Sequence, residues 1–582
     1  MTIFDVLTLI GGVSLFLYGM SVMGKALERT AGGKLETTLG KLTNNRAAGL
    51  LTGLGVTAAI QSSGATTVMV VGFVNSGIMT LRQAIPVIMG SNIGTTVTAW
   101  LLSLTGIKGG NLFLQLLKPM SFTPILALIG ICLQMFAKSK KKKDFGAIFL
   151  GFAVLMFGMD IVSGAVAPLK DVPEFRQLFV MFENPILGII MGAVVTTIMQ
   201  SSSASVGILQ AFTSTGAITY SSTIPIIMGQ NIGSCTTALL SSVGANKNAR
   251  RVSMVHLFFN VIGTVIWLIV YCIVKWVFAP TILGQSATET GIATIHSLFN
   301  ISCVIMLFPA SKLLEKLAYK LIPESETSEK TVELDERLLL TPAVAINQTY
   351  ELTLKMAEVT RESLILSIDC LTKYDAKKAE KIHEIEDLTD HYEDIIGSYL
   401  VKLSSKTLNE KEGAMASVLL KAIGDFERIT DHAVNILESS EELREKEIKF
   451  TEKGIKEMTS LCQATLDIVN LSHDAFIKND TEIANLVEPL EEVIDKMKKL
   501  LRANHIERLR QGVCGIEAGF VWSDLISNME RVSDHCSNIA GCVIDIAKNN
   551  MNLHESLKTM RGESEFYREK YQEYTTKYID IL

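Results

Sequence analysis

Charge is absent from two long stretches of this 582-residue chain. No Lys, Arg, Asp or Glu occurs at residues 47–81 or 185–246. The mean hydropathy is +0.32, although charged residues make up 20% of the chain. A high mean hydropathy and a large charged fraction can occur together if the chain has two regions, an apolar one up to about residue 320 and a charged one after it. A chain of this length is also too long for a single core.

The signatures of several protein classes are also missing. The nine cysteines are scattered without a CxxC pair, which argues against a zinc site and a disulfide framework. No P-loop is present, so we do not expect ATP hydrolysis. No nucleophile–base pair stands out, so an enzyme is the least supported interpretation. The net charge of −6 gives no reason to expect nucleic acid as a partner.

One pair of motifs occurs twice, 139 residues apart and without a gap. QSSGA at 61–65 returns as QSSSA at 200–204, and IPVIMGSNIG at 85–94 returns as IPIIMGQNIG at 224–233. Both copies lie in apolar sequence. Two copies of a polar, glycine-interrupted motif in hydrophobic halves are typical of a secondary transporter with its site where the repeats meet.

Apolar segments fill the first 320 residues. The longer ones can span a bilayer. Those flanking each QSS motif are shorter and predict re-entrant helical hairpins, which must be buried in protein or line a cavity. The first segment has no basic leader or clear cleavage site, so we expect a retained helix. The segments are 3–24, 47–60, 64–81, 84–104, 118–137, 145–164, 185–199, 204–218, 224–243, 252–278 and 292–310.

Loop charges predict that the two halves have opposite orientations. The segment after the first helix carries five basic residues, whereas its counterpart carries two basic and three acidic ones. Cytoplasmic loops are enriched in Lys and Arg, so the first segment lies inside and the second outside. The basic clusters at 138–143 and 247–251 also lie inside. The repeats, about 5–137 and 145–310, are therefore inverted, and the chain after residue 320 is cytoplasmic.

Hydroxyl and amide side chains gather at the repeated motifs. Without Lys or Arg nearby, a ligand must be bound by these groups, by the backbone and by broken helix ends. Helix N-termini suit an oxyanion, and hard oxygen atoms suit Na⁺. Close helix packing is the structural alternative for small polar residues, but two ungapped copies favour a site. The candidates are Gln61, Ser62, Ser63, Thr66, Thr67, Asn92, Thr95 and Thr96, and Gln200, Ser201, Ser202, Ser203, Ser205, Asn231, Ser234 and Thr237.

The paired QSS motifs resemble the type II sodium-dependent phosphate cotransporter family over roughly residues 5–310. The resemblance implies a symporter that imports inorganic phosphate with Na⁺ by alternating access. It implies phosphate near Ser62, Ser63, Ser201, Ser202 and Ser203. It implies Na⁺ or hairpin support at Gln61, Thr66, Asn92, Thr95, Thr96, Gln200, Ser205, Asn231, Ser234 and Thr237. Gly64 stands where vertebrate members have a third serine, which removes one hydroxyl and loosens the backbone.

Electrostatics supports cation coupling separately from the resemblance. A phosphate ion in an apolar site without Lys or Arg would be costly unless co-bound Na⁺ neutralised it. A neutral solute would also be tolerated there. Three alternatives therefore stay open: a carrier of another oxyanion, a carrier of a neutral solute, and a membrane-tethered phosphate sensor.

A second pair of polar motifs lies in the apolar segments. HLFFN at 256–260 recurs as HSLFN at 296–300. Hydrogen bonding between helices is the simpler interpretation, and sensing of protons or substrate is the alternative.

The charged region predicts a helical bundle. We divide the chain into a membrane transport domain (1–320), a polar linker (321–339) and a helical domain (340–582). In the last, apolar residues recur at helical spacing without a competing strand pattern. DFERITDH at 425–432 is similar to NMERVSDH at 528–535, and ExxxD occurs at 386–390 and 491–495. That spacing puts two carboxylates on one helix face, where paired helices could hold a metal ion.

The repeated ERx[ST]DH element resembles the PhoU domain over about 340–550, a pair of three-helix bundles associated with phosphate regulation. The resemblance implies one metal-binding set per bundle: Glu386, Asp390, Glu427 and Asp431, and Glu491, Asp495, Glu530 and Asp534. The complete prediction is an all-α, multi-pass inner-membrane protein with inverted repeats and re-entrant hairpins, followed by a cytoplasmic PhoU-like bundle. Its predicted partners are phosphate, Na⁺ and the lipid bilayer. The bundle regulates transport or mediates a homodimer.

Overall fold

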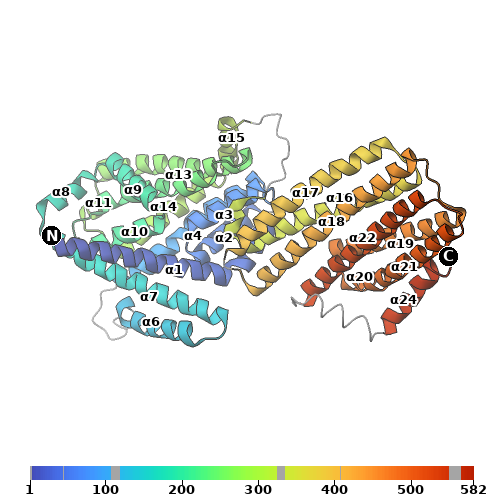
Figure 1. Cartoon of the computed structure of the whole chain (residues 1–582). Coiled ribbons are helices and arrows are strands. Elements are labelled where there is room, and N and C mark those ends of the chain that lie inside the picture. The colour runs from blue at the N-terminus through green and yellow to red at the C-terminus, as the bar shows by residue number, and fades with distance from the viewer. Residues whose placement is uncertain (1–2, 43–44, 107–117, 324–333, 407, 549–564) are drawn as a thin grey trace. The chain divides into compact units, whose positions relative to one another are not determined.

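Helices build the whole of the described structure. The computed structural model describes residues 3–42, 45–106, 118–323, 334–406, 408–548 and 565–582. Within these residues the only β pairing is an isolated bridge between Thr219 and Ser286. The chain divides into unit 1 (Met1–Thr331) and unit 2 (Val332–Leu582) (Figure 1). The predicted all-α class is confirmed, whereas the middle of the predicted linker and residues 107–117 lie outside the described residues.

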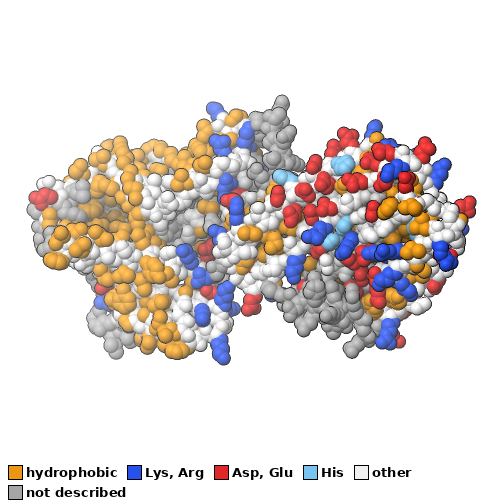
Figure 2. Space-filling view, in the orientation of Figure 1, with side chains coloured by type: hydrophobic (Ala, Val, Ile, Leu, Met, Phe, Trp, Pro, Cys, Tyr) orange, Lys and Arg blue, Asp and Glu red, His pale blue; other side chains and the backbone are white. Residues whose placement is uncertain are grey.

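Unit 1 is a membrane domain. Six of its described helices are long and apolar enough to cross a bilayer. Figure 2 shows hydrophobic side chains spread over the surface of unit 1, whereas charged side chains cover unit 2. An apolar surface this wide is not stable in water. The six helices are α1 (Ile3–Leu42), α4 (Leu81–Ser103), α6 (Pro119–Phe136), α7 (Lys140–Val166), α13 (Lys247–Ile273) and α14 (Glu289–Leu307).

Two short helix pairs occupy the positions of the predicted hairpins. The first is α2 (Arg46–Ile60) with α3 (Ser63–Asn75), and the second is α9 (Pro185–Met199) with α10 (Ser202–Ala211). The helices of the first pair have 15 and 13 residues. At 1.5 Å per residue they are about 20 Å long, too short for a hydrocarbon core of about 30 Å. The helices of the second pair, with 15 and 10 residues, are also too short. None of the four can cross alone, as the predicted re-entrant hairpins require.

The repeat persists in the helix boundaries, with one difference. The helices α2, α3 and α4 begin 139 residues before α9, α10 and α11 (Tyr220–Gly233). However, α4 is continuous, whereas its counterpart is interrupted at Ser234 and resumes as α12 (Cys235–Ser241). The Ser234 hydroxyl donates to the Asn231 carbonyl at 2.6 Å, a local bond that competes with the helix ladder. The sequence predicted one continuous segment over 224–243 and missed this interruption.

Glycines bring the helices of each repeat into backbone contact. A Cβ atom on Gly53 of α2 would lie 2.0 Å from the Val87 carbonyl oxygen in α4. A Cβ atom on Gly192 of α9 would lie 2.0 Å from the Ile226 carbonyl oxygen in α11. No side chain fits at such distances, so glycine sets these two helix crossings.

A short helix that the sequence analysis did not resolve, α15 (Ser311–Leu321), follows the last span. The buried Arg251 of α13 holds its end: Nε and Nη2 donate to the Ile322 carbonyl at 2.9 and 2.8 Å. The same guanidinium lies 4.0 Å from the centre of the Tyr319 ring. The start of α13 and the end of α15 are thereby joined. One further short helix of unit 1 is α8 (Pro173–Met181).

Unit 2 consists of two three-helix bundles. The first contains α16 (Pro342–Thr372), α17 (Ala376–Ser404) and α18 (Glu410–Glu445). The second contains α19 (Glu452–Lys478), α21 (Val487–Arg510) and α22 (Ile516–Lys548). The bundles pack against each other through α18 and α22. The short α20 (Thr481–Ala484) and the last helix, α24 (Glu565–Tyr578), pack on the second bundle.

We predict that Gly53→Ala destabilises unit 1, because its methyl group would collide with the backbone of α4. Overpacking of this kind costs about 1–3 kcal/mol. Gly55→Ala is the matched control, since a Cβ atom there meets nothing within 4 Å. Thermal unfolding of the purified protein in detergent should show a lower melting temperature for Gly53→Ala and an equal or slightly higher one for Gly55→Ala. Equal melting of both variants with the parent would contradict the glycine crossing.

Candidate functional site

The two QSS turns meet at one cavity of about 70 Å³ in unit 1. Both hairpins and the interrupted α11–α12 helix contribute to its lining. No lining side chain is charged. The lining residues are Gln61, Ser62, Ser63 and Gly64 of the first hairpin, Gln200, Ser201, Ser202 and Ser203 of the second, and Ser234 and Thr237 beside the interruption. The fold thus unites motifs that lie far apart in the sequence.

Both turns follow the same backbone path. Gln61 and Gln200 take left-handed conformations, with φ of 60° and 52°. The next serine is extended and caps the following helix, its Oγ accepting a backbone N–H at 3.1 Å for Ser62 and 3.2 Å for Ser201. The N-termini of α3 and α10 therefore open onto the cavity. Their first turns offer backbone N–H groups and partial positive charge, which suit an oxyanion.

Nine of the fifteen predicted ligand residues line the cavity, including all five predicted phosphate serines. The other six are not part of its lining. Some of these side chains donate to a carbonyl of their own helix: Thr95 donates to the Ser91 carbonyl at 3.1 Å, and Asn231 donates to the Ile227 carbonyl at 2.9 Å. The six residues outside the lining are Thr66, Asn92, Thr95, Thr96, Ser205 and Asn231.

The first hairpin is tied to α4 by side-chain hydrogen bonds. Thr98 Oγ1 donates to Gln61 Oε1 at 2.7 Å, which fixes the amide at the turn. Deeper in the hairpin, Thr57 Oγ1 lies 3.0 Å from Thr66 Oγ1 and 2.8 Å from Ser91 Oγ. All three hydroxyls are buried. These contacts join α2, α3 and α4 into one body.

The second hairpin carries a different polar group at the same place. The residues equivalent to the three hydroxyls of the first repeat are Thr196, Ser205 and Gln230. Gln230 Nε2 donates to Ser205 Oγ at 2.9 Å. Gln230 Oε1 and Thr196 Oγ1 are buried and have no hydrogen-bond partner within the described part of the chain. The sequence analysis missed Thr196 and Gln230, although the 139-residue offset from Thr57 and Ser91 pointed to them.

Asn92 belongs to a buried polar cluster outside the lining of the cavity. Its Oδ1 atom lies 3.3 Å from His256 Nε2, and its Nδ2 atom lies 3.5 Å from Asn260 Oδ1. Asn260 Nδ2 also approaches Cys235 Sγ at 3.3 Å. The HLFFN motif therefore makes the interhelical contact that the simpler interpretation expected, linking α13 to α4 and α12.

One predicted metal-binding set in unit 2 comes together. Carboxylate oxygen atoms of Glu386, Asp390 and Asp431 lie within 4.8 Å of one another. Burial, followed by the neighbouring carboxylates, raises the pKa of Glu386 and of Asp390. Burial and the adjacent Asp431 raise the pKa of Glu427 to about 7. Close carboxylates with raised pKa values form a donor set that a hard or borderline cation would stabilise.

The equivalent set in the second bundle has lysine partners. Lys498 Nζ lies 2.8 Å from Glu530 Oε2, and Lys499 Nζ lies 2.7 Å from Asp495 Oδ2. These ammonium groups neutralise two of the four carboxylates without a metal ion. The sequence analysis did not weigh the lysines, although Lys499 follows Asp495 at the helical spacing of four residues.

The histidines of the repeated ERx[ST]DH element join the two bundles. His432 Nδ1 lies 2.9 Å from Asn528 Oδ1, and His535 Nδ1 lies 2.8 Å from Asp425 Oδ1. The two rings stack with centroids 5.7 Å apart. Each copy of the motif therefore binds the opposite bundle, a role that its sequence pattern alone did not reveal.

We predict that Gly64→Ser, which adds a hydroxyl at the cavity, strengthens binding of the phosphate that the resemblance implies. A Cβ atom on Gly64 would have ordinary contacts, the nearest being Thr237 Oγ1 at 3.5 Å. One added hydrogen bond is worth about 1 kcal/mol, roughly a fivefold change in Kd. Gly64→Ala is the control that adds bulk without a hydroxyl. Calorimetric titration with phosphate should separate the two variants, and equal affinities would refute the effect of the hydroxyl.

Family models match both units. The model described as "Na+/Pi-cotransporter" matches residues 15–164 and 172–296. The PhoU domain model matches residues 353–440 and 458–543.

Several relatives share these regions. The "Putative inorganic phosphate export protein YjbB" of Escherichia coli O157:H7 is 23% identical over 548 residues, covering 93% of this chain and 97% of the relative. The "Phosphate-specific transport system accessory protein PhoU homolog 1" of Thermotoga maritima is 30% identical over 223 residues, covering 37% of this chain and 94% of the relative. "Sodium-dependent phosphate transport protein 2A" of Rattus norvegicus is 23% identical over 381 residues, covering 44% and 60%.

Among solved structures, PhoU from Streptococcus pneumoniae covers 36% of this chain and 98% of its own length, with 17% identity and a TM-score of 0.33. The two family models together account for most of both units. The chain belongs to the Na⁺/Pi-cotransporter family and carries a PhoU domain after its membrane unit.

Proposed function

We propose that the protein is a sodium-coupled symporter that imports inorganic phosphate by alternating access. The observation that carries the proposal is the meeting of two QSS turns and two helix N-termini at one uncharged cavity. Membership of the Na⁺/Pi-cotransporter family supports phosphate as the solute. The inward Na⁺ gradient is then the source of energy.

The cavity suits a small oxyanion. Its volume of about 70 Å³ is well below the roughly 300–1,000 Å³ of sites for drug-sized ligands. Serine hydroxyls and the N–H groups of two helix ends are donors to phosphate oxygens. Phosphate would lie near Ser62, Ser63, Ser201, Ser202 and Ser203.

Na⁺ would complete the site, because the lining holds no Lys or Arg to neutralise the anion. A buried oxygen atom without a hydrogen-bond donor lowers the stability of the fold unless a cation or a water molecule approaches it. Thr196 Oγ1 and Gln230 Oε1 are two such atoms, and the Gln230 side chain contacts the predicted ligand Ser205. We therefore add Thr196 and Gln230 to the sodium ligands. The sodium ligands that the family resemblance implies are Gln61, Thr66, Asn92, Thr95, Thr96, Gln200, Ser205, Asn231, Ser234 and Thr237.

The proposed orientation puts the PhoU domain in the cytoplasm and the protein in the inner membrane. Loop contacts support the grouping of the basic segments on one side. Arg29 Nε lies 2.8 Å from Asp144 Oδ1, joining α1, at the end of its candidate span Ile3–Thr30, to the start of α7. The Asn246 N–H donates to Asn75 Oδ1 at 2.8 Å, joining the start of α13 to the end of the first hairpin. Both pairs are expected if the basic segments face the cytoplasm.

Phosphate export is a second candidate function. It is favoured by the relatives named as putative phosphate export proteins, one of which aligns with 93% of this chain, including the PhoU region. The direction of a coupled carrier depends on the ion and solute gradients, so the cavity is compatible with either direction.

The PhoU domain is proposed to regulate transport, or to join two copies in a homodimer, and to hold a metal ion. The fitting donor set is Glu386, Asp390 and Asp431, with Glu427 beside it. A metal would neutralise these carboxylates and stiffen the packing of α17 against α18.

The first test is uptake of radiolabelled phosphate into proteoliposomes. We expect uptake to require an inward Na⁺ gradient and to fall roughly tenfold or more in Gln61→Ala and in Gln200→Ala, since polar contacts to an ion are worth about 1.5–3 kcal/mol. Gln285→Ala, at an exposed residue outside the cavity, should keep the parent rate.

Other results would redirect the proposal. Saturable phosphate binding without uptake would indicate a sensor. If sulfate or a neutral solute competed with radiolabelled phosphate for uptake, the result would indicate that the protein carries another solute. Phosphate efflux from preloaded cells that express the protein, in place of net uptake, would replace import with export.

We further predict that the full-length protein binds Mn²⁺, measured by electron paramagnetic resonance of the free ion. Asp431→Asn should abolish binding at the first bundle, whereas Glu530→Gln in the second bundle should retain it. Metal ligands must be deprotonated, and burial raises the pKa of Glu386, Asp390 and Glu427. Mn²⁺ affinity should therefore decrease as the pH falls below about 7. Retained binding in Asp431→Asn would rule out this site.

A further inference from the structure

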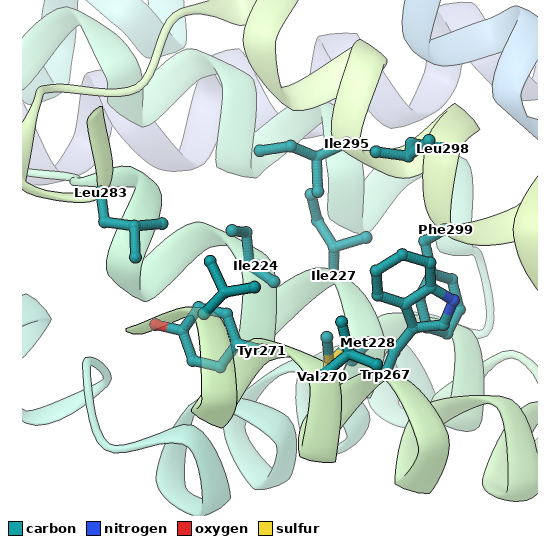
Figure 3. A pocket seen from close by; sticks show the side chains of 11 residues that line it. Ile224, Ile227, Met228, Trp267, Val270, Tyr271, Leu283, Ile295, Leu298 and Phe299 are labelled. Carbon is teal, nitrogen blue, oxygen red and sulfur yellow. The ribbon is translucent and has the colours of Figure 1, made fainter. Parts of the chain in front are cut away.

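A second cavity in unit 1 has the opposite chemistry to the QSS cavity. It has a volume of about 150 Å³ and lies among α11, α13, α14 and the turn Thr281–Gly284. All eleven lining side chains are apolar or aromatic. Figure 3 shows Ile224 and Ile227 of α11 between Ile295 of α14 and Tyr271 of α13. Neither the family match nor the proposed transport cycle assigns a ligand to this cavity.

Water is a poor occupant of the cavity. The Tyr271 hydroxyl already donates to the Ser221 carbonyl at 2.8 Å. The Trp267 indole Nε1 is buried and has no acceptor in the described ranges. A buried water needs two to four polar partners, and apolar cavities of about 150 Å³ stay dry and bind small apolar molecules. The cavity therefore favours hydrocarbon.

The lining of the cavity reaches the exposed surface of two candidate membrane spans. α13 and α14 both belong to the candidate membrane spans. Leu298 of α14 is 58% exposed and Val270 of α13 is 38% exposed. In a membrane, the medium beside such side chains is the acyl region of the bilayer. A hydrocarbon chain can thus enter laterally without crossing water.

We propose that this cavity is a binding site for a phospholipid acyl chain. The bilayer supplies that occupant at far higher concentration than any other apolar molecule, and the lining has no charged group to select a polar one. The acyl chain would fill a cavity whose lining atoms otherwise lack packing contacts on that side.

The occupied cavity would also influence the transport site; this consequence rests on the proposed transport function, whereas lipid binding does not. Ile224, Ile227 and Met228 of α11 form one wall. The same helix ends beside Ser234, which lines the QSS cavity. An acyl chain wedged between α11 and the two spanning helices would restrict how α11 can move during alternating access.

The binding test uses the full chain in detergent with Trp100→Phe and Trp276→Phe, which leaves Trp267 as the tryptophan of unit 1. Trp522 in unit 2 is 1% exposed and provides an unquenched baseline. The probe is a phosphatidylcholine brominated on one acyl chain. We expect saturable quenching of Trp267. Val270→Phe, which fills the cavity, should reduce the quenching at least twofold, whereas Ile269→Phe, on a 57% exposed neighbour, should not.

Ile295→Phe fills the same cavity from α14 and replaces Val270→Phe if that variant does not fold. Quenching that is linear in lipid, or equal in the Val270→Phe and Ile269→Phe proteins, would overturn the binding site. Phosphate uptake is then measured in both variants. Loss of quenching with at least a twofold change in uptake rate supports the link to α11. Loss of quenching with unchanged uptake would keep the lipid site and reject that link.

Discussion

The central constraint on this protein is electrostatic: the candidate site lies in a membrane unit, and its lining contains no Lys or Arg. Donors for an anion must then come from hydroxyl groups and helix ends, and helix ends occur inside a membrane only where helices break. The two left-handed glutamine turns provide those breaks. The glycine crossings at Gly53 and Gly192 then hold each hairpin against the following helix. The lack of Lys and Arg at the site thus accounts both for the broken helices of the fold and for the helix ends at the cavity.

Duplication supplies the symmetry of both units, and departures from it mark the positions where cations would bind. The first hairpin is closed by mutually bonded hydroxyls, whereas the second leaves Thr196 Oγ1 and Gln230 Oε1 buried without donors. In unit 2, the carboxylates of Glu386, Asp390 and Asp431 lie close together in the first bundle. In the second bundle, Lys498 and Lys499 neutralise Glu530 and Asp495. In each unit, one copy keeps oxygen atoms available for a cation.

Patterns of local composition revealed much of this arrangement, but not its contacts. The apolar segments and their lengths predicted the helical class and the hairpins, and the repeated QSS motifs with the family resemblance predicted the five serines at the cavity. These patterns could not show that Thr98 fixes Gln61, since that bond depends on how α4 packs against the hairpin. The interruption at Ser234 was also missed, because both repeats have nearly the same sequence there. Differences between aligned positions, such as Ser91 and Gln230, were the signal left unused.

The most direct test of the account is the affinity of the purified protein for phosphate with saturating Na⁺ and with choline in its place. If Na⁺ neutralises the anion in an uncharged cavity, each ligand must strengthen the binding of the other. The account predicts a phosphate Kd at least tenfold lower in Na⁺, and a Na⁺ affinity raised equally by phosphate. Equal phosphate affinity in Na⁺ and in choline would contradict it.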